Sequence, residues 1–484
     1  MRLITTFLGG MVIASSFILP TATASNLNME PCHIKGLAEQ VECGFLTVPE
    51  NYAEANGRTL DIHVVRLPAV ATAAEKDPLL FLAGGPGQAA TELVGGIGRI
   101  FSDVRQTRDL LFIDQRGTGK SSPLACETTD MSILLDALVV EDNEYDIGPE
   151  IAKCAAEYDV NFQHYSTHDA VRDFDAVREA LGYSQVNIYG GSYGTRSGLA
   201  YMREFPDSIR TAVLDGVAPP QVKLGLFSHS ANNAFQRMLN DCSEQEACHE
   251  AFPDIDEQYH KVINRLQQAS ELITLPDPRS HQPLDVRMTV NRFNQMIFPA
   301  LYSPRTRQLL PFVINEAAAG NYSPIAGLSG PVDAKSALYT GLTLSVLCQE
   351  DIPRIIGTDF VREAEADYMG SALMENFIAM CLEWPVSPSE EYVWQPVASD
   401  IPTLLLSGGQ DPVTPPEWAE LAAETLTNAT HVVAEAGGHT IASHTCANEL
   451  VADFITDPTT KLDTTCLAET KVLPFLLNVN ARGM

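Results

Sequence analysis

The stretch VNIYGGSYGT at residues 186–195 constrains the fold of this chain more than any other feature. A β-branched, apolar run ends abruptly in the pattern G-x-S-x-G, and residues 199–205 then place apolar side chains at helical spacing. The stretch therefore predicts a strand, a sharp turn and a helix, with Ser192 on the turn. Small residues on both sides of the serine let such a strained turn form, so its hydroxyl stands above the sheet as a candidate nucleophile.

Other continuous apolar runs predict a mostly parallel sheet. Such runs are typical of strands buried on both faces, and several of them end in glycine-containing turns. Because the carboxyl ends of parallel strands meet at one edge of a sheet, the turns also predict a site at that edge. The runs are residues 78–83, 109–114, 210–217, 401–407 and 430–435. Two leading segments, residues 44–48 and 60–67, alternate apolar and polar side chains and are expected to be antiparallel strands.

The region between two of these runs has a different character. Residues 218–400 consist mainly of helix-like amphipathic segments broken by proline-rich turns. We expect them to form a large helical cap inserted between core strands. The chain then divides into a signal peptide at residues 1–24, the first part of an α/β core at 25–217, the cap at 218–400 and the second part of the core at 401–484.

The amino terminus has the layout of a secretory signal peptide. A positive charge at Arg2 precedes the mostly apolar residues 3–19, and the small-residue pattern that follows predicts cleavage after Ala24. A membrane anchor is the alternative, but this apolar run is short and no later run is long enough to span a bilayer. We therefore expect a secreted or periplasmic protein without stable membrane insertion.

All 10 cysteines lie beyond the expected signal peptide, and an even number in an oxidising compartment predicts five disulfides. The sequence leaves the pairing open, and we favour neighbours in sequence because they close short loops. These pairs are Cys32 with Cys43, Cys126 with Cys154, Cys242 with Cys248, Cys348 with Cys381 and Cys446 with Cys466. A zinc site at Cys242, Cys248 and His249 is the alternative, but it lacks a second ligand pair at metal spacing. We expect no metal and no cofactor.

The chain is strongly acidic. Its 62 aspartate and glutamate residues against 31 lysine and arginine residues give a formal net charge of −31 at pH 7. Such a charge repels phosphate backbones and anionic lipid, so nucleic acid is not an expected partner. The acidity is typical of a heavily solvated surface. Nothing in the sequence indicates an oligomeric state.

A serine nucleophile needs a base, and the base needs a carboxylate that holds it in one tautomer. Asp411 and His439 follow glycine turns at the ends of the last two core runs. Together with Ser192 they give the chain order serine, aspartate, histidine that is expected of an α/β-hydrolase. Asp215 also ends a core run and is the rival acid. We favour Asp411 because it lies one strand before the histidine.

Five motifs together resemble the prolyl iminopeptidase and tripeptidyl aminopeptidase family of serine exopeptidases. They are GGPG at 84–87, DQRGTGKS at 114–121, GGSYGT at 190–195, GGQD at 408–411 and GGH at 437–439. The resemblance implies an α/β-hydrolase fold, the triad Ser192, Asp411 and His439, and an oxyanion hole made by the backbone N–H groups of Gly85 and Tyr193. The length, the signal and parts of the cap resemble the secreted tripeptidyl aminopeptidase branch.

Within the second of these motifs, Arg116 is expected to pair with Asp114 and brace the neighbouring loop. The role expected for both residues is structural.

Three classes of function fit this set of residues. An aminopeptidase acting on peptides with a free amino terminus needs a carboxylate in the cap to bind the ammonium group, and Glu350 is our candidate because it follows Cys348. Competing cap carboxylates are Glu363, Glu365 and Glu375. A carboxylesterase acting on small esters needs only an apolar acyl pocket. A binding protein on an inactive hydrolase fold is disfavoured because all three triad positions are filled.

Overall fold

The structure is a computed structural model of the chain, and it describes residues 27–54, 56–126, 147–276, 282–328, 338–478 and 480. The expected signal peptide, with its cleavage after Ala24, lies outside these residues. Over the described ranges, no helix has the length and apolar character needed to cross a bilayer.

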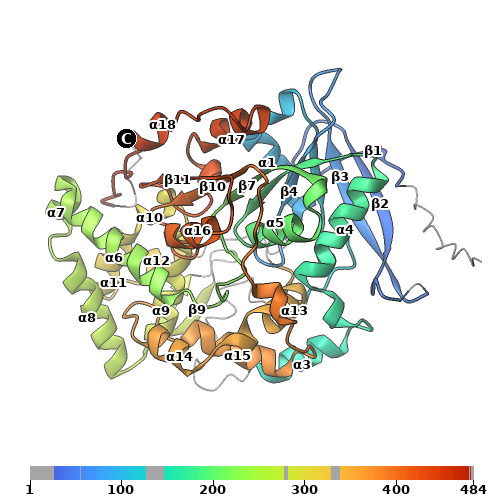
Figure 1. Cartoon of the computed structure of the whole chain (residues 1–484). Helices are drawn as coiled ribbons and strands as arrows, with labels where there is room; N and C mark the ends of the chain where they lie inside the picture. The colour runs from blue at the N-terminus through green and yellow to red at the C-terminus, as the bar shows by residue number, and fades with distance from the viewer. Residues whose placement is uncertain are drawn as a thin grey trace, which may run out of the picture.

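The described strands of the core form a nine-stranded sheet in the order β1-β2-β3-β5-β4-β6-β7-β10-β11 (Figure 1). The pairs β1–β2, β2–β3 and β3–β5 are antiparallel and the remaining pairs are parallel. The strands are β1 (Glu30–Cys32), β2 (Val41–Pro49), β3 (Thr59–Leu67), β4 (Leu79–Leu82), β5 (Leu110–Ile113), β6 (Val186–Gly191), β7 (Ile209–Asp215), β10 (Thr403–Gly408) and β11 (Ala429–Ala434). The predicted fold class, a mostly parallel sheet with antiparallel leading strands, is confirmed.

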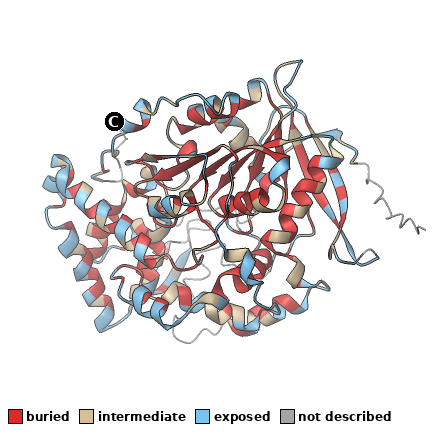
Figure 2. Ribbon diagram, in the orientation of Figure 1, coloured by how far each residue is buried: buried red, intermediate tan, exposed pale blue. Residues whose placement is uncertain are grey.

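Helices cover both faces of the sheet, which explains the continuous apolar runs. Every residue of β4, β5, β6 and β10 is buried. Alternate residues of one strand enter different cores, so that Leu80 packs with side chains of α4 and α5, whereas Phe81 packs with side chains of α1 and α17. The central strands are therefore red over their whole length in Figure 2. These helices are α1 (Val94–Ile100), α4 (Thr167–Ala180), α5 (Tyr193–Glu204) and α17 (Ala447–Thr456).

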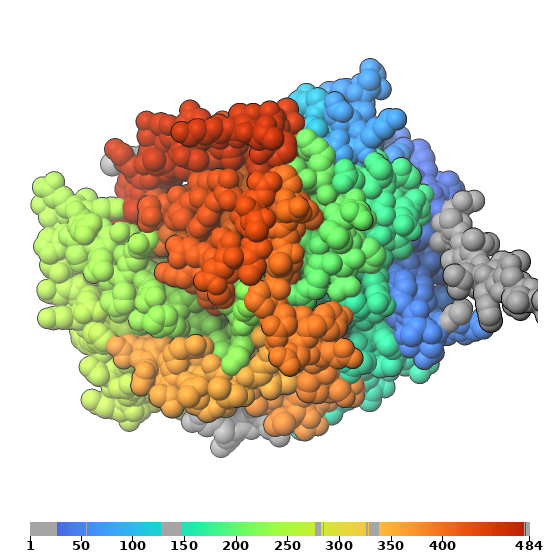
Figure 3. Space-filling model, in the orientation of Figure 1, coloured from blue at the N-terminus to red at the C-terminus, as the bar shows by residue number. Residues whose placement is uncertain are grey.

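The segment between β7 and β10 forms the cap, which lies against the core in Figure 3. It has an apolar core of its own, in which Phe235, Tyr259 and Phe293 are buried. Its helices are α6 (Ser228–Glu244), α7 (Glu246–Ala251), α8 (Ile255–Gln268), α9 (Val290–Ile297), α10 (Pro304–Arg307), α11 (Leu310–Ala318), α12 (Ser323–Leu328), α13 (Thr340–Glu350), α14 (Gly357–Ala364) and α15 (Ala372–Glu383). Besides these helices the cap contains an antiparallel hairpin that the sequence patterns did not predict, β8 (Glu271–Pro276) with β9 (Pro283–Met288).

Arg116 is buried and does not pair with Asp114. Its guanidinium donates two hydrogen bonds of 2.7 Å to the carboxylate of Asp173 on α4, and it also donates to the backbone carbonyl of Glu50. Asp114 instead accepts hydrogen bonds from the hydroxyl and the backbone N–H of Thr91. The expected pair is therefore wrong, because each side chain finds a partner from a different part of the chain.

The ten cysteines form five disulfides between the neighbouring pairs favoured from sequence order. They are Cys32–Cys43, Cys126–Cys154, Cys242–Cys248, Cys348–Cys381 and Cys446–Cys466. Cys348 on α13 and Cys381 on α15 join two helices of the cap. Cys242 and Cys248 are bonded to each other, so neither thiolate is free to bind a metal.

We expect the native, unreduced protein to contain no free thiol and to melt at a lower temperature after reduction. Each bridge restricts the unfolded chain and contributes about 2–4 kcal/mol to stability. Alkylation followed by mass spectrometry counts free thiols, and thermal melts with and without dithiothreitol measure the second effect. Alkylation of several cysteines in the native protein would contradict the pairing.

Candidate active site

Ser192 lies on a strained turn between β6 and α5. Its backbone has φ 57° and ψ −125°, a conformation that residues with side chains rarely adopt. The flanking glycines make the turn possible, because a Cβ on Gly190 would lie 2.3 Å from the carbonyl oxygen of Gly194 and a Cβ on Gly194 would lie 2.1 Å from that of Leu82. The G-x-S-x-G pattern thus forms the strand-turn-helix element that the sequence predicts.

The GGPG loop at 84–87 follows β4 and packs directly on this turn. A Cβ on Gly84 would lie 3.2 Å from the Cβ of Ser192 and 3.1 Å from the carbonyl oxygen of Gly191. Gly85 has a positive φ of 110°, which orients the loop backbone in a way that a glycine adopts without strain. The candidate oxyanion donors, the N–H groups of Gly85 and Tyr193, therefore belong to two segments in contact.

His439 and Asp411 form a direct hydrogen bond. Nδ1 of His439 lies 2.7 Å from Oδ2 of Asp411, whose Oδ1 accepts hydrogen bonds of 2.9 Å from the backbone N–H groups of Val413 and Thr414. The hydroxyl of Thr414 donates to Oδ2 at 2.6 Å. With its oxygens held in this way, the carboxylate can fix the tautomer of the imidazole.

The pKa of His439 is raised above its ordinary value. Burial alone would lower this pKa, but the negative charge of Asp411 and its hydrogen bond outweigh burial. The side chain of His439 is 11% exposed. A buried imidazole stabilised in its charged form suits a general base that must accept a proton from serine.

The serine turn and the histidine turn share a neighbour. The backbone N–H of Ser192 donates to the carbonyl oxygen of Asp215 at 2.9 Å. A Cβ on the next residue, Gly216, would lie 3.2 Å from Cε1 of His439. The chain that follows β7 therefore contacts both candidate catalytic residues and holds their turns together.

Asp215, the rival acid, supports the turn after the histidine. Its carboxylate accepts hydrogen bonds of 2.9 Å from the backbone N–H groups of Ile441 and Ala442, and one of 2.8 Å from the hydroxyl of Tyr189. Burial raises the pKa of Asp215 to about 6. The two acids therefore have different partners. Asp411 is hydrogen-bonded to the imidazole of His439, whereas Asp215 accepts hydrogen bonds from backbone N–H groups after His439.

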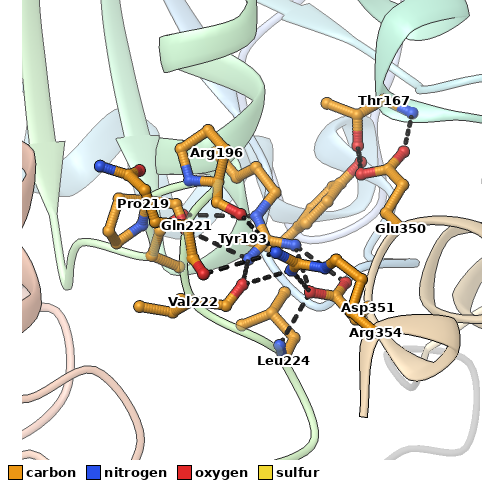
Figure 4. A network of polar contacts seen from close by, with 12 residues as sticks. Thr167, Tyr193, Arg196, Pro219, Gln221, Val222, Leu224, Glu350, Asp351 and Arg354 are labelled. Atoms are coloured by element: carbon orange, nitrogen blue, oxygen red, sulfur yellow. Dashed lines mark hydrogen bonds and ion pairs between the residues drawn. The ribbon is translucent and has the colours of Figure 1, made fainter. Parts of the chain in front are cut away.

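Glu350 lies in the protein interior, beside the helix that begins after Ser192. Its carboxylate accepts two hydrogen bonds of 2.8 Å from Thr167, one from the backbone N–H and one from the hydroxyl. The Thr167 hydroxyl is also bonded to that of Tyr193 at 2.7 Å, and Figure 4 shows Tyr193 between this contact and the Arg196–Asp351 pair. Glu350 is 2% exposed, and burial raises its pKa to about 7.

Tyr302 of the cap was not predicted as part of the site, yet it contacts His439. Its backbone carbonyl accepts a hydrogen bond of 2.8 Å from the backbone N–H of His439. Its ring lies edge-on to the imidazole, with centroids 5.2 Å apart and an interplanar angle of 78°. Tyr302 is far from the triad in sequence and carries no motif, so no pattern in the sequence could have identified it.

Known proteins resemble this chain over most of its length. A family model described as TAP-like protein matches residues 366–466, which include the turns of Asp411 and His439. The serine protease Hip1 of Mycobacterium tuberculosis is 25% identical over 77% of this chain and 76% of that protein. Tripeptidyl aminopeptidase of Streptomyces lividans is 24% identical over 92% of this chain and 87% of that protein. The chain is a serine hydrolase related to the tripeptidyl aminopeptidases.

A shorter match extends the same relationship. Proline iminopeptidase of Neisseria gonorrhoeae is 31% identical over 140 residues, which are 29% of this serine hydrolase and 32% of that protein. Two of these relatives, the tripeptidyl aminopeptidase and the proline iminopeptidase, carry the names of the family that the five sequence motifs resemble.

Separate replacement of the two acids distinguishes their roles. We expect Asp411→Asn to lower kcat by about 10³- to 10⁴-fold with a small change in Tm, because the imidazole loses its correct tautomer. Asp215→Asn should lower stability by about 1–3 kcal/mol with a smaller loss of kcat, because it disturbs acceptors of two buried N–H groups. Steady-state kinetics and thermal melts measure both effects. A larger loss of kcat in Asp215→Asn would reverse the assignment.

Proposed function

We propose that this serine hydrolase is a secreted or periplasmic aminopeptidase that releases amino-terminal residues, as prolyl or tripeptidyl units, from peptides. The observation that carries the proposal is the hydrogen bond of 2.7 Å between His439 and Asp411, together with the chain after β7 that contacts both His439 and the strained Ser192. The tripeptidyl aminopeptidase and proline iminopeptidase relatives support this choice of substrate.

In the proposed mechanism, Ser192 attacks the carbonyl carbon of the scissile peptide bond while His439 takes the hydroxyl proton. Asp411 stabilises the imidazolium that forms, and the N–H groups of Gly85 and Tyr193 bind the developing oxyanion. The imidazolium then donates its proton to the leaving amine, which leaves an acyl-enzyme. Water, activated by His439, hydrolyses this ester and restores the serine.

Five disulfides support a location outside the cytoplasm, because such bonds persist mainly in oxidising compartments. The signal peptide at residues 1–24 remains part of the proposal. We therefore propose extracellular or periplasmic peptides with a free amino terminus as the substrates.

A carboxylesterase is the second candidate, and one observation favours it. Both carboxylate oxygens of Glu350 accept hydrogen bonds from Thr167, and the side chain is 2% exposed. A substrate ammonium group would have to reach this interior position or bind another cap carboxylate. An esterase needs no ammonium site and would use the same triad on small esters.

Substitution of the triad tests the catalytic assignment. We expect Ser192→Ala and His439→Ala each to lower turnover by about 10³- to 10⁶-fold while the protein stays folded, because triad residues act as a unit. A fluorophosphonate probe should label the unmodified protein at Ser192, as peptide mapping by mass spectrometry would show. Undiminished hydrolysis in either variant, or no label on Ser192, would refute the proposed triad.

A substrate panel with Glu350→Gln tests the aminopeptidase. Aminoacyl, prolyl and tripeptidyl chromogenic amides, free and N-blocked, are compared with short acyl esters. If Glu350 binds the ammonium group, Glu350→Gln should raise KM for free-amino amides by about 10-fold or more and leave ester hydrolysis nearly unchanged. Glu383→Gln, at an exposed cap position on α15, serves as the matched control.

The other outcomes of this panel are equally informative. Equal losses on amides and esters would show that Glu350 acts through Thr167 and Tyr193 on the serine turn. No loss on either substrate would assign ammonium binding to another carboxylate. Preference for N-blocked amides or esters over free-amino amides in the unmodified enzyme would favour the esterase.

A further inference from the structure

The cap touches the histidine turn through backbone as well as side chain. The backbone N–H of His439 donates to the carbonyl oxygen of Tyr302 at 2.8 Å. The preceding residue, Gly438, lies so close that a Cβ there would be 2.4 Å from the same oxygen and 3.1 Å from Cδ of Pro304. The cap segment between η5 (Phe298–Leu301) and α10 therefore packs closely against the histidine turn, and a side chain at position 438 would collide with it.

The cap also holds the turn of the acid. Asp241 of α6 accepts a hydrogen bond of 3.2 Å from the side chain of Gln410, the residue before Asp411. Arg307 of α10 bonds to the same carboxylate at 2.5 Å, and Arg237 of α6 donates to the backbone carbonyl of Gly409. Together with the contact of Tyr302 on His439, these hydrogen bonds show that the cap contacts both the acid turn and the base turn.

The side chain of Tyr302 forms part of the environment of the His439 imidazole. Its ring packs edge-on against His439, and burial together with the charge of Asp411 raises the pKa of its phenol. Aromatic rings in this geometry attract each other beyond the effect of the area they bury. A ring at this position both limits rotation of the imidazole and displaces water from it.

We propose that Tyr302 is a positioning residue supplied by the cap, which orients the imidazole of His439 and shields the His439–Asp411 pair from water. The inference rests on the triad of the proposed function. It makes the cap part of the catalytic machinery, since displacement of the segment around Tyr302 removes both the ring and the carbonyl from the histidine turn.

The charge state of His439 provides a specific readout. The charges of Asp411 and Asp215 raise its pKa. The phenol of Tyr302 faces it from the cap, and His444, whose own pKa is lowered by burial, accepts a hydrogen bond from the N–H of Gly438. Burial is the largest influence on the pKa of His439 and lowers it. Removal of the Tyr302 ring admits water and relieves this burial, while the direct hydrogen bond of His439 to Asp411 remains. The pKa therefore rises and the acidic limb of the kcat/KM profile moves to higher pH.

The test compares Tyr302→Ala with Tyr302→Phe, which keeps the ring. We expect Tyr302→Ala to lower kcat by about 10- to 100-fold with little change in KM, because a misplaced base loses its alignment with serine. Its fluorophosphonate labelling rate should fall in parallel and its acidic limb should move upward. Tyr302→Phe should restore all three quantities. Phe360→Ala is the matched control, because Phe360 is an exposed aromatic residue of the cap, on α14.

Four results would overturn the inference. They are an unchanged kcat and acidic limb in Tyr302→Ala, an effect confined to KM, equal losses in Tyr302→Phe, and the same shift of the acidic limb in Phe360→Ala. Thermal melts identify a variant that does not fold, and Tyr302→Leu then replaces Tyr302→Ala. Labelling of the unmodified enzyme at Ser192 separates this test from the proposed function, because that labelling does not depend on Tyr302 being a positioning residue.

Discussion

The close backbone approach at Ser192 determines the arrangement of everything around it. A turn with φ 57° at a residue that carries a side chain persists only when the surrounding structure holds it. Here the carbonyl of Leu82 packs closely against Gly194, and the GGPG loop contacts Ser192. The carbonyl oxygen of Asp215, at the end of β7, accepts a hydrogen bond from the backbone N–H of Ser192. Strands β4, β6 and β7 therefore must be adjacent and parallel, which requires crossover helices and hence the layered core.

The second constraint is the set of buried polar contacts that α13 and the residue after it make between cap and core. Helix α13 contacts the GGPG loop through the hydroxyl of Thr343, which donates to the carbonyl of Pro86 at 2.7 Å. Beyond its other end Asp351 bonds to Arg196 of α5, with both carboxylate oxygens 2.8 Å from the guanidinium. A buried pair of this kind adds little net stability, but removal of one partner leaves an uncompensated charge. The pair therefore links the cap segment after α13 to the serine helix, and loss of either partner would be costly.

What could be predicted from the sequence depends on residues that lie close together along the chain. The turn at Ser192 and the apolar runs carry their own signals, and the order of the strands favours Asp411 over Asp215. Contacts between distant segments carry no such signal. The sequence suggests Asp114 as the partner of Arg116, whereas the fold supplies Asp173. Likewise the burial of Glu350 depends on what packs around α13, and the edge-on ring of Tyr302 depends on how the cap sits.

The contact between Gly438 and the carbonyl of Tyr302 limits how this architecture can be rearranged. Here any side chain at position 438 would collide with the cap backbone, and the histidine turn in turn takes one of its hydrogen bonds from the cap. A chimaera that joins this core to a foreign cap would break this junction unless the histidine turn and the segment around Tyr302 were exchanged as a unit.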